Sequence, residues 1–210
     1  MDNFETEEQQ IDAIKKWWQE NYKMVIVAFV LGIGSIIGIQ TWKQQKLINA
    51  ETASIEYDRI TQLSGEQQGG ALIKSRVESM MNDFSDSPYS SLAVLLEAKK
   101  LVDSGELAAA EEKLRWVVAE SNDNSLRHVA RLHLATVLSA QGKHEEAIEL
   151  LEVEQDKFSP SYLELKGDIL VSMGRREEAK AVYDQALQAY ATIGARAQLL
   201  QLKRNDLGSS

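Results

Sequence analysis

Three glycines near the N-terminus have a spacing that could bind a nucleotide. Gly32, Gly34 and Gly38 form the pattern G-x-G-x-x-x-G. A dinucleotide site would also need a strand before the glycines, a helix opening on them and an acidic residue about 20 positions on. Glu51 and Glu56 lie near that distance. The alternative is a helix in lipid, where small residues four positions apart let another helix approach closely.

Three histidines and three acidic pairs are the other groups that could do chemistry. His128 and His133 are five positions apart, about 140° around a helix, so their rings do not face one metal ion. His144 begins "HEEA", which lacks the second histidine of the zinc motif H-E-x-x-H. We expect the acidic pairs to lie in solvated first turns of helices, where the helix dipole favours negative charge. These pairs are Glu111 with Glu112, Glu145 with Glu146, and Glu177 with Glu178.

None of these groups forms a catalytic constellation, and the chain contains no cysteine. Thiolate metal sites and disulfides are therefore excluded. We predict a protein that is not an enzyme and that needs neither a metal nor a cofactor.

The sequence around the glycines is apolar over a length that spans a membrane. "MVIVAFVLGIGSIIGIQTW", from Met24 to Trp42, contains 19 residues and no ionisable side chain. A helix of this length measures roughly 28 Å, close to the hydrocarbon thickness of a bilayer. The residues before it are too many and too acidic for the n-region of a signal peptide. We therefore predict a permanent transmembrane helix over residues 24–42 in preference to a dinucleotide site.

Aromatic and basic residues flank the span on both sides, as they do at membrane interfaces. We predict five interfacial anchors: Trp17, Trp18, Lys23, Trp42 and Lys43. Inside the span, small residues one turn apart would contact another transmembrane helix, and these are Ala28, Gly32, Gly34 and Gly38. Three lysines precede the span and two follow it, which favours a cytoplasmic N-terminus by the positive-inside rule.

The rest of the chain is acidic and has a helical pattern. Residues 51–210 hold 18 Lys and Arg against 26 Asp and Glu, which argues against binding nucleic acid or anionic headgroups. Prolines occur only at Pro88 and Pro160, and no period-two alternation predicts strands. We predict an all-α protein: a tail over residues 1–23 with a short amphipathic helix, the span, and a helical domain over 43–210.

A helix-turn-helix pattern recurs three times in this domain. Its turns centre on Gly105, Gly142 and Gly174, which are 37 and 32 positions apart. A small residue stands seven positions before each glycine and an alanine five positions after it, where two helices would cross closely. The small residues are Ala98, Ala135 and Gly167, and the alanines are Ala110, Ala147 and Ala179. Bulky residues stand nine positions after the glycines: Leu114, Leu151 and Tyr183.

This pattern resembles tetratricopeptide repeats, helix-turn-helix units of about 34 residues that stack into a solenoid. We predict repeat units over about 88–121, 125–157 and 160–190, with flanking helices over 46–84 and 191–205. In such arrays the first helices of the units line a groove that binds partner peptides. The expected groove residues flank the small position of each unit: Lys99, Val102, Thr136, Ser139, Asp168 and Val171.

The whole chain resembles the YfgM family, bacterial inner-membrane proteins described as ancillary subunits of the SecYEG translocon. The most specific likeness is the tail "TEEQQIDAIKKWWQENYK" running into "GIGSIIG". The resemblance implies a cytoplasmic N-terminus, a periplasmic repeat domain, and association with SecYEG and the periplasmic chaperone PpiD. It also implies a scaffold beside nascent or unfolded polypeptides. An alternative is a membrane-bound regulator whose tail sequesters a cytoplasmic signalling protein.

Overall fold

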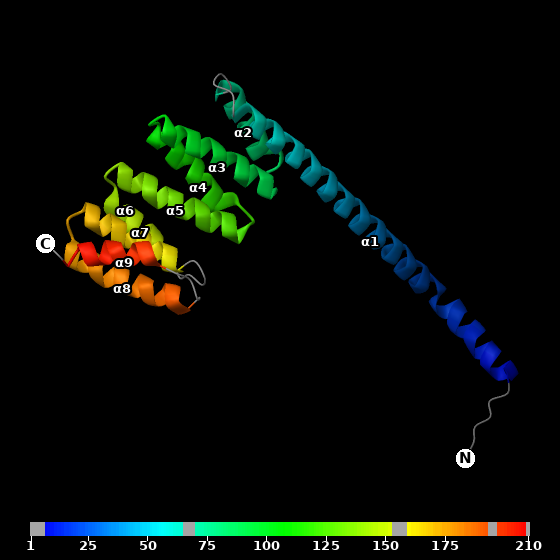
Figure 1. The fold of residues 1–210 in the computed structure, drawn as a ribbon. Helices are drawn as coiled ribbons and strands as arrows, with labels where there is room; N and C mark the ends of the chain where they lie inside the picture. Colours follow the sequence, from blue (N-terminus) through cyan, green and yellow to red (C-terminus); the bar gives the residue numbers. More distant parts are fainter. Residues whose placement is uncertain (1–6, 65–69, 153–158, 193–196, 209–210) are drawn as a thin grey trace, which may run out of the picture. The chain divides into compact units, whose positions relative to one another are not determined.

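Every described element of the chain is a helix (Figure 1), which confirms the all-α prediction. The computed structural model describes residues 7–64, 70–152, 159–192 and 197–208. The chain divides into two compact units, one up to Asn49 and one from Ala50 onward. The helices are α1 (Glu7–Ser64), α2 (Gly70–Asp83), α3 (Pro88–Asp103), α4 (Leu107–Glu120), α5 (Asn124–Ala140), α6 (His144–Leu151), α7 (Ser159–Ser172), α8 (Arg176–Thr192) and α9 (Gln198–Asp206).

The first unit consists of the N-terminal part of α1, which is helical throughout from Glu7. The glycines at 32, 34 and 38 lie inside this helix, so the strand and turn that a dinucleotide site requires are absent from the described residues around them. Hydroxyl groups stay within the helix: Ser35 Oγ donates to the Leu31 carbonyl at 2.8 Å, and Thr41 Oγ1 donates to the Ile37 carbonyl at 3.0 Å. Such internal bonding suits an apolar solvent.

α1 is long and apolar enough to cross a membrane, and no other helix among the described residues is. The helix does not break between the tail and the span, so the predicted amphipathic helix and transmembrane helix are parts of one element. Residues 1–6 of the predicted tail lie outside the described part.

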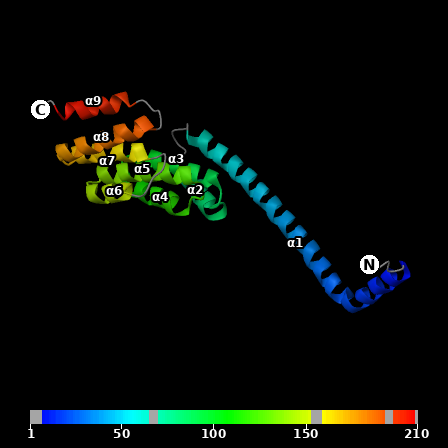
Figure 2. The same cartoon turned by 90° about the horizontal axis from the view of Figure 1, so that it is seen from below.

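The second unit contains three helical hairpins, α3 with α4, α5 with α6, and α7 with α8. First helices contact one another along the chain, α3 with α5 and α5 with α7, and the same order is visible from below in Figure 2. Flanking helices pack at both ends. Ala53 and Ile60, from the end of α1, share an apolar cluster with Ile73 and Val77 of α2, while α9 packs on α8.

The turns of the three hairpins share one backbone geometry. Gly105, Gly142 and Gly174 have φ angles of 82°, 80° and 76°, a left-handed conformation that favours glycine. In each turn the N–H of the next residue donates to the carbonyl four positions before the glycine, at 2.8 to 2.9 Å. The glycine spacing in the sequence therefore identified real helix-turn-helix units.

The small residues lie where the two helices of a hairpin cross. In the third hairpin an ideal Cβ on Gly167 would stand 2.2 Å from Cε1 of Tyr183, so no side chain fits there without displacing the ring. In the first hairpin Ala98 accompanies the smaller Leu114 in one core cluster. The size of the small residue thus varies inversely with the size of the residue 16 positions later.

Two of the three acidic pairs, those at 111–112 and 145–146, contribute ion pairs between neighbouring hairpins. The pairs at 145–146 and 177–178 occupy the first turns of α6 and α8, as expected. For Glu111 the expectation is wrong, because α4 begins at Leu107 and the Glu111 side chain is only 14% exposed. Its carboxylate accepts from Lys143 Nζ at 2.7 Å and also pairs with Arg115. The contact with Lys143, followed in weight by Arg115, lowers the pKa of Glu111 to about 2 despite its burial.

Candidate functional site

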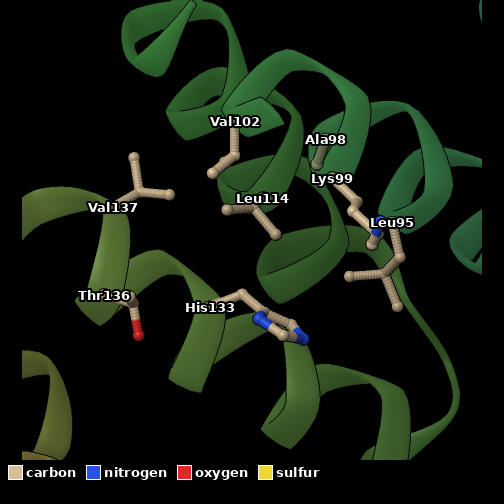
Figure 3. A pocket seen from close by; sticks show the side chains of 8 residues that line it. All are labelled: Leu95, Ala98, Lys99, Val102, Leu114, His133, Thr136 and Val137. Atoms are coloured by element: carbon tan, nitrogen blue, oxygen red, sulfur yellow. The ribbon is translucent and has the colours of Figure 1, made fainter. Parts of the chain in front are cut away.

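A pocket of about 240 Å³ opens between the first two hairpins (Figure 3). α3 supplies one wall, α5 supplies the other, and a side chain of α4 lies beneath them. The lining residues are Leu95, Ala98, Lys99, Val102, Leu114, His133, Thr136 and Val137. Because α3 and α5 are first helices of adjacent hairpins, this is the position of the groove predicted from the repeats.

Helical periodicity places the α3 residues on one face. Leu95, Ala98 and Val102 are three and four positions apart, so they follow one stripe of the helix. Ala98, Leu114 and Val137 are buried and form the floor, whereas Val102 is 39% exposed at the rim. The pocket therefore offers an apolar floor open to solvent on one side, as ligand sites commonly do.

The polar groups of the pocket stand at its rim. Thr136 Oγ1 donates to the Leu132 carbonyl at 2.9 Å, and Lys99 Nζ pairs with Asp103 at 3.2 Å in an exposed contact. His133 keeps access to solvent, yet desolvation by the surrounding protein lowers its pKa, so its ring is mostly neutral at pH 7. No carboxylate is among the lining residues, although the domain as a whole is acidic.

Three of the six expected groove residues meet in this pocket, namely Lys99, Val102 and Thr136. Ser139 lies one turn further along α5, and its Oγ is 3.1 Å from Nδ1 of His144. Sequence reasoning missed His133. The signal was available, since this residue stands one helical turn before Thr136 on the same face of α5.

The two expected groove residues of the third hairpin are engaged within the chain. Asp168 accepts hydrogen bonds from Lys203 Nζ at 2.9 Å and from the Tyr183 hydroxyl at 2.7 Å. Val171 is partly buried and packs against the cluster that contains Tyr183 and Leu200. Both residues therefore contact elements that follow them in the chain, and α9 supplies Lys203 and Leu200.

The second candidate site is the span itself. An added Cβ on Gly32, Gly34 or Gly38 would meet nothing within 4 Å among the described atoms, so internal packing does not require glycine at these positions. Together with Ala28 they remain predicted contacts to another transmembrane helix. Among the predicted interfacial anchors, Trp17, Trp18 and Trp42 are exposed along α1, and Lys46 Nζ lies 4.4 Å from the Trp42 ring centroid.

A wider cavity of about 540 Å³ lies among α2, α3 and α4. Its lining mixes lysines with glutamates, and the buried Glu97 carboxylate is 3.0 Å from Lys113 Nζ. Acids and bases thus neutralise one another around it. Among the described residues no group of three or more His, Cys, Asp or Glu could hold a metal ion.

Comparisons with known proteins match the chain over almost its whole length. The family model of the tetratricopeptide repeat-like domain matches residues 15–209. The ancillary SecYEG translocon subunit of Haemophilus influenzae is 33% identical, with 96% of this chain and 97% of that protein covered. The ancillary SecYEG translocon subunit of Escherichia coli is 26% identical, with 99% of both chains covered. That of Neisseria gonorrhoeae is 25% identical, with 96% and 97% covered.

Proposed function

Because this chain belongs to the tetratricopeptide repeat-like family that includes the ancillary SecYEG translocon subunits, we propose that it is a membrane-anchored adaptor of the SecYEG translocon. Its function is to hold a protein-binding domain beside the channel. It performs no reaction, and it supplies binding surfaces alone.

In this proposal α1 crosses the bacterial inner membrane once, with the N-terminus in the cytoplasm and the repeat domain in the periplasm. The lysine distribution around the span supports this orientation. The small residues Gly34 and Gly38 lie one turn apart and would contact a transmembrane helix of the translocon. Anchoring both partners in one membrane raises their effective concentration, so that even a loose contact outside the membrane becomes useful.

The pocket between α3 and α5 is the proposed docking site for the chaperone PpiD or for polypeptides that leave the channel. The observation that carries this proposal is the meeting of Lys99, Val102 and Thr136 above an apolar floor. Such a floor accepts an apolar side chain of an extended partner, while the rim groups contact its backbone or polar side chains. The anchor would therefore hold the protein beside the channel, and the groove would bind the chaperone or the emerging polypeptide there.

Substitution of one rim residue tests the docking site. Val102→Asp would put a charge beside the apolar floor, and Val129→Asp is the matched control because Val129 is 37% exposed on α5 but does not line the pocket. The full chain is purified from membranes in mild detergent, and copurifying proteins are quantified. We expect Val102→Asp to retain SecYEG and lose the chaperone or client proteins, and we expect Val129→Asp to retain both. Equal loss from the two variants, or no loss from Val102→Asp, would contradict the assignment.

Substitution in the span tests the anchor separately. Gly34→Leu adds a bulky side chain to the proposed helix contact without touching the repeat domain. We expect this variant to insert into the membrane and to lose copurifying SecYEG. Undiminished recovery of SecYEG with Gly34→Leu, and with Gly32→Leu on the nearly opposite side of α1, would place the translocon contact elsewhere.

A further inference from the structure

The groove of the third hairpin is occupied by the chain's own last helix. Leu200 of α9 is 1% exposed and shares an apolar cluster with Tyr183 and Ala186 of α8. Lys203 Nζ, one turn later on α9, lies 3.0 Å from Glu164 Oε1 and 2.9 Å from each carboxylate oxygen of Asp168. The ammonium group thus binds Glu164 and Asp168, which occupy the repeat positions of Leu95 and Lys99 in the first hairpin. The leucine packs beside Tyr183, which occupies the position of Leu114.

The acceptors for this ammonium group are held in place by the hairpin itself. The Tyr183 hydroxyl donates to Asp168 Oδ1 at 2.7 Å, and the Tyr190 hydroxyl donates to Glu164 Oε2 at 2.9 Å. Two carboxylates fixed by two phenols form an anionic site for one cation. Because Glu164, Asp168 and both tyrosines belong to α7 and α8, the site does not depend on α9 for its construction.

Few contacts hold α9 in this site. Leu200 is the only buried side chain among its nine residues. The N-cap residue Ala197 provides no side-chain acceptor, and helices of this length are not stable on their own. The remaining attachments are the flanking residues Ala197 and Leu207, which are partly buried against the same cluster, and a hydrogen bond from Arg176 to the Asp206 carbonyl at 3.3 Å. Partly exposed ion pairs, such as Arg204 with Asp184 at 2.8 Å, contribute little each.

The outer face of α9 differs from that of an ordinary terminal cap. Caps of repeat arrays present a polar face to solvent. α9 instead leaves Leu199 65% exposed and Leu202 61% exposed. α9 therefore buries one leucine and exposes two others. In this respect it resembles a docked ligand more than a cap.

We propose that the third hairpin is a second docking site, which α9 occupies until a partner helix displaces it. The partner helix presents a leucine and, three positions later, a lysine. Its leucine enters the cluster around Tyr183 and Ala186, and its ammonium group binds Glu164 and Asp168. The two carboxylates select this chemistry by charge complementarity. The site shares no residue with the pocket lined by Lys99 and Thr136, so an experiment that excludes one site does not exclude the other.

A peptide copy of α9 tests the proposal. The full chain in detergent micelles is titrated into a fluorescein-labelled peptide with the sequence of residues 197–208, and anisotropy gives the affinity. Lys203→Met in the full chain keeps the length of the side chain but removes the charge that holds α9. We expect this variant to bind the peptide at least about tenfold more tightly than the wild type, because the site is open in a larger fraction of molecules. Lys166→Met is the matched control, since its lysine is on α7 and pairs with Glu152, outside the site.

A second peptide, with Glu in place of the lysine, checks the charge requirement. We expect no binding of this peptide to any of the variants. Equal affinity of wild type and Lys203→Met for the first peptide, or equal binding of the two peptides, would overturn the proposal. Should Lys203→Met fail to fold, amide hydrogen exchange of the wild-type chain decides: exchange in α9 at least about tenfold faster than in α8 supports displacement, and equal protection contradicts it.

Discussion

The same repeat positions are open to a partner in the first hairpin and are covered by another helix of the chain in the third. On α3, Lys99 and Val102 line an open pocket, and on α7 the corresponding Asp168 and Val171 lie under contacts with α9. The repeat position fixes on which face of the domain a side chain lies. The neighbouring helix then decides whether that side chain is available to a partner.

The two hairpins also differ at their crossings and junctions. Tyr183 crosses against Gly167 in the third hairpin, whereas the first has Leu114 with Ala98. The junction between the first and second hairpins contains the partly buried ion pair of Glu111 with Lys143. The two helices of the third hairpin therefore pack more closely at their crossing. The stability of the junction between the first and second hairpins depends more on an ion pair.

Removing the buried leucine of α9 should make the third groove open like the first. Leu200→Ala deletes a side chain that is 1% exposed, and we expect it to weaken the docking of α9 by about 2–4 kcal/mol. Hydrogen exchange over residues 198–206 should accelerate while α3 to α6 keep their protection. Leu199→Ala is the control, because a leucine that is 65% exposed should change stability by less than about 0.5 kcal/mol. Similar effects from the two variants would show that α9 is not held through Leu200.

Exchanging the crossing residues tests why the third hairpin contains glycine. Gly167→Ala adds a methyl group that would clash with the Tyr183 ring. We expect the free energy of unfolding, measured with urea, to fall by about 1–3 kcal/mol even though alanine is the better helix former. Adding Tyr183→Leu reproduces the alanine and leucine of the first hairpin and should recover most of the loss. A double variant no more stable than Gly167→Ala would refute this size compensation.

The junction of the first two hairpins should be sensitive to acid. The pKa of Glu111 is lowered from 4.5 to about 2, chiefly by Lys143, so ionised Glu111 stabilises the fold above about pH 4.5. That stabilisation is lost as the pH falls toward 2, since protonation of the folded state removes the pairing. Glu111→Gln should therefore cost about 1–2 kcal/mol at pH 7 and flatten the acid limb of the stability curve.

The matched substitution is Glu145→Gln at the next junction. Glu145 is exposed and lies 3.4 Å from Arg175, so its loss should change the free energy of unfolding by less than about 0.5 kcal/mol. Urea titrations between pH 2 and pH 7 compare the two variants. A Glu145 effect as large as that of Glu111 would remove the distinction between the junctions.

The smallest expected effect on stability comes from the titration of His133, whose ring lies at the rim of the open pocket. Desolvation lowers the pKa of His133 below 6.5, so NMR titration of the full chain should give a midpoint under that value. Since the unfolded state binds this proton more readily, stability should fall slightly as the pH drops through 6.5, and His133→Gln should remove the slope. A midpoint at or above 6.5 would mean that the pocket walls do not desolvate the ring.

The features that sequence predicted are local and periodic. The turn glycines, the small crossing residues and the places of Lys99, Val102 and Thr136 on first helices each follow from the pattern of the hairpin to which the residue belongs. The continuous helix through Gly32, Gly34 and Gly38 followed equally from the uninterrupted apolar run that forms part of α1.

The features that sequence missed depend on residues far apart in the chain. Lys203 reaches Asp168 across 35 positions, and nothing in the pattern of α7 indicates which helix lies above it. The pairing of Glu111 with Lys143 likewise joins different hairpins across 32 positions. Solvation of an acidic pair depends on where its helix begins and on the neighbouring hairpin, and neither can be read from the pair alone.

The most direct test of the central claim is site-specific photocrosslinking in cells. A photoreactive residue at Thr136 probes the open pocket, and one at Glu149, exposed on α6 away from it, is the control. We predict that Thr136 forms crosslinks to a periplasmic chaperone or an emerging polypeptide, and that Glu149 gives few or none. Equal products from both positions, or crosslinks from Thr136 only to cytoplasmic proteins, would contradict the adaptor and its orientation in the membrane.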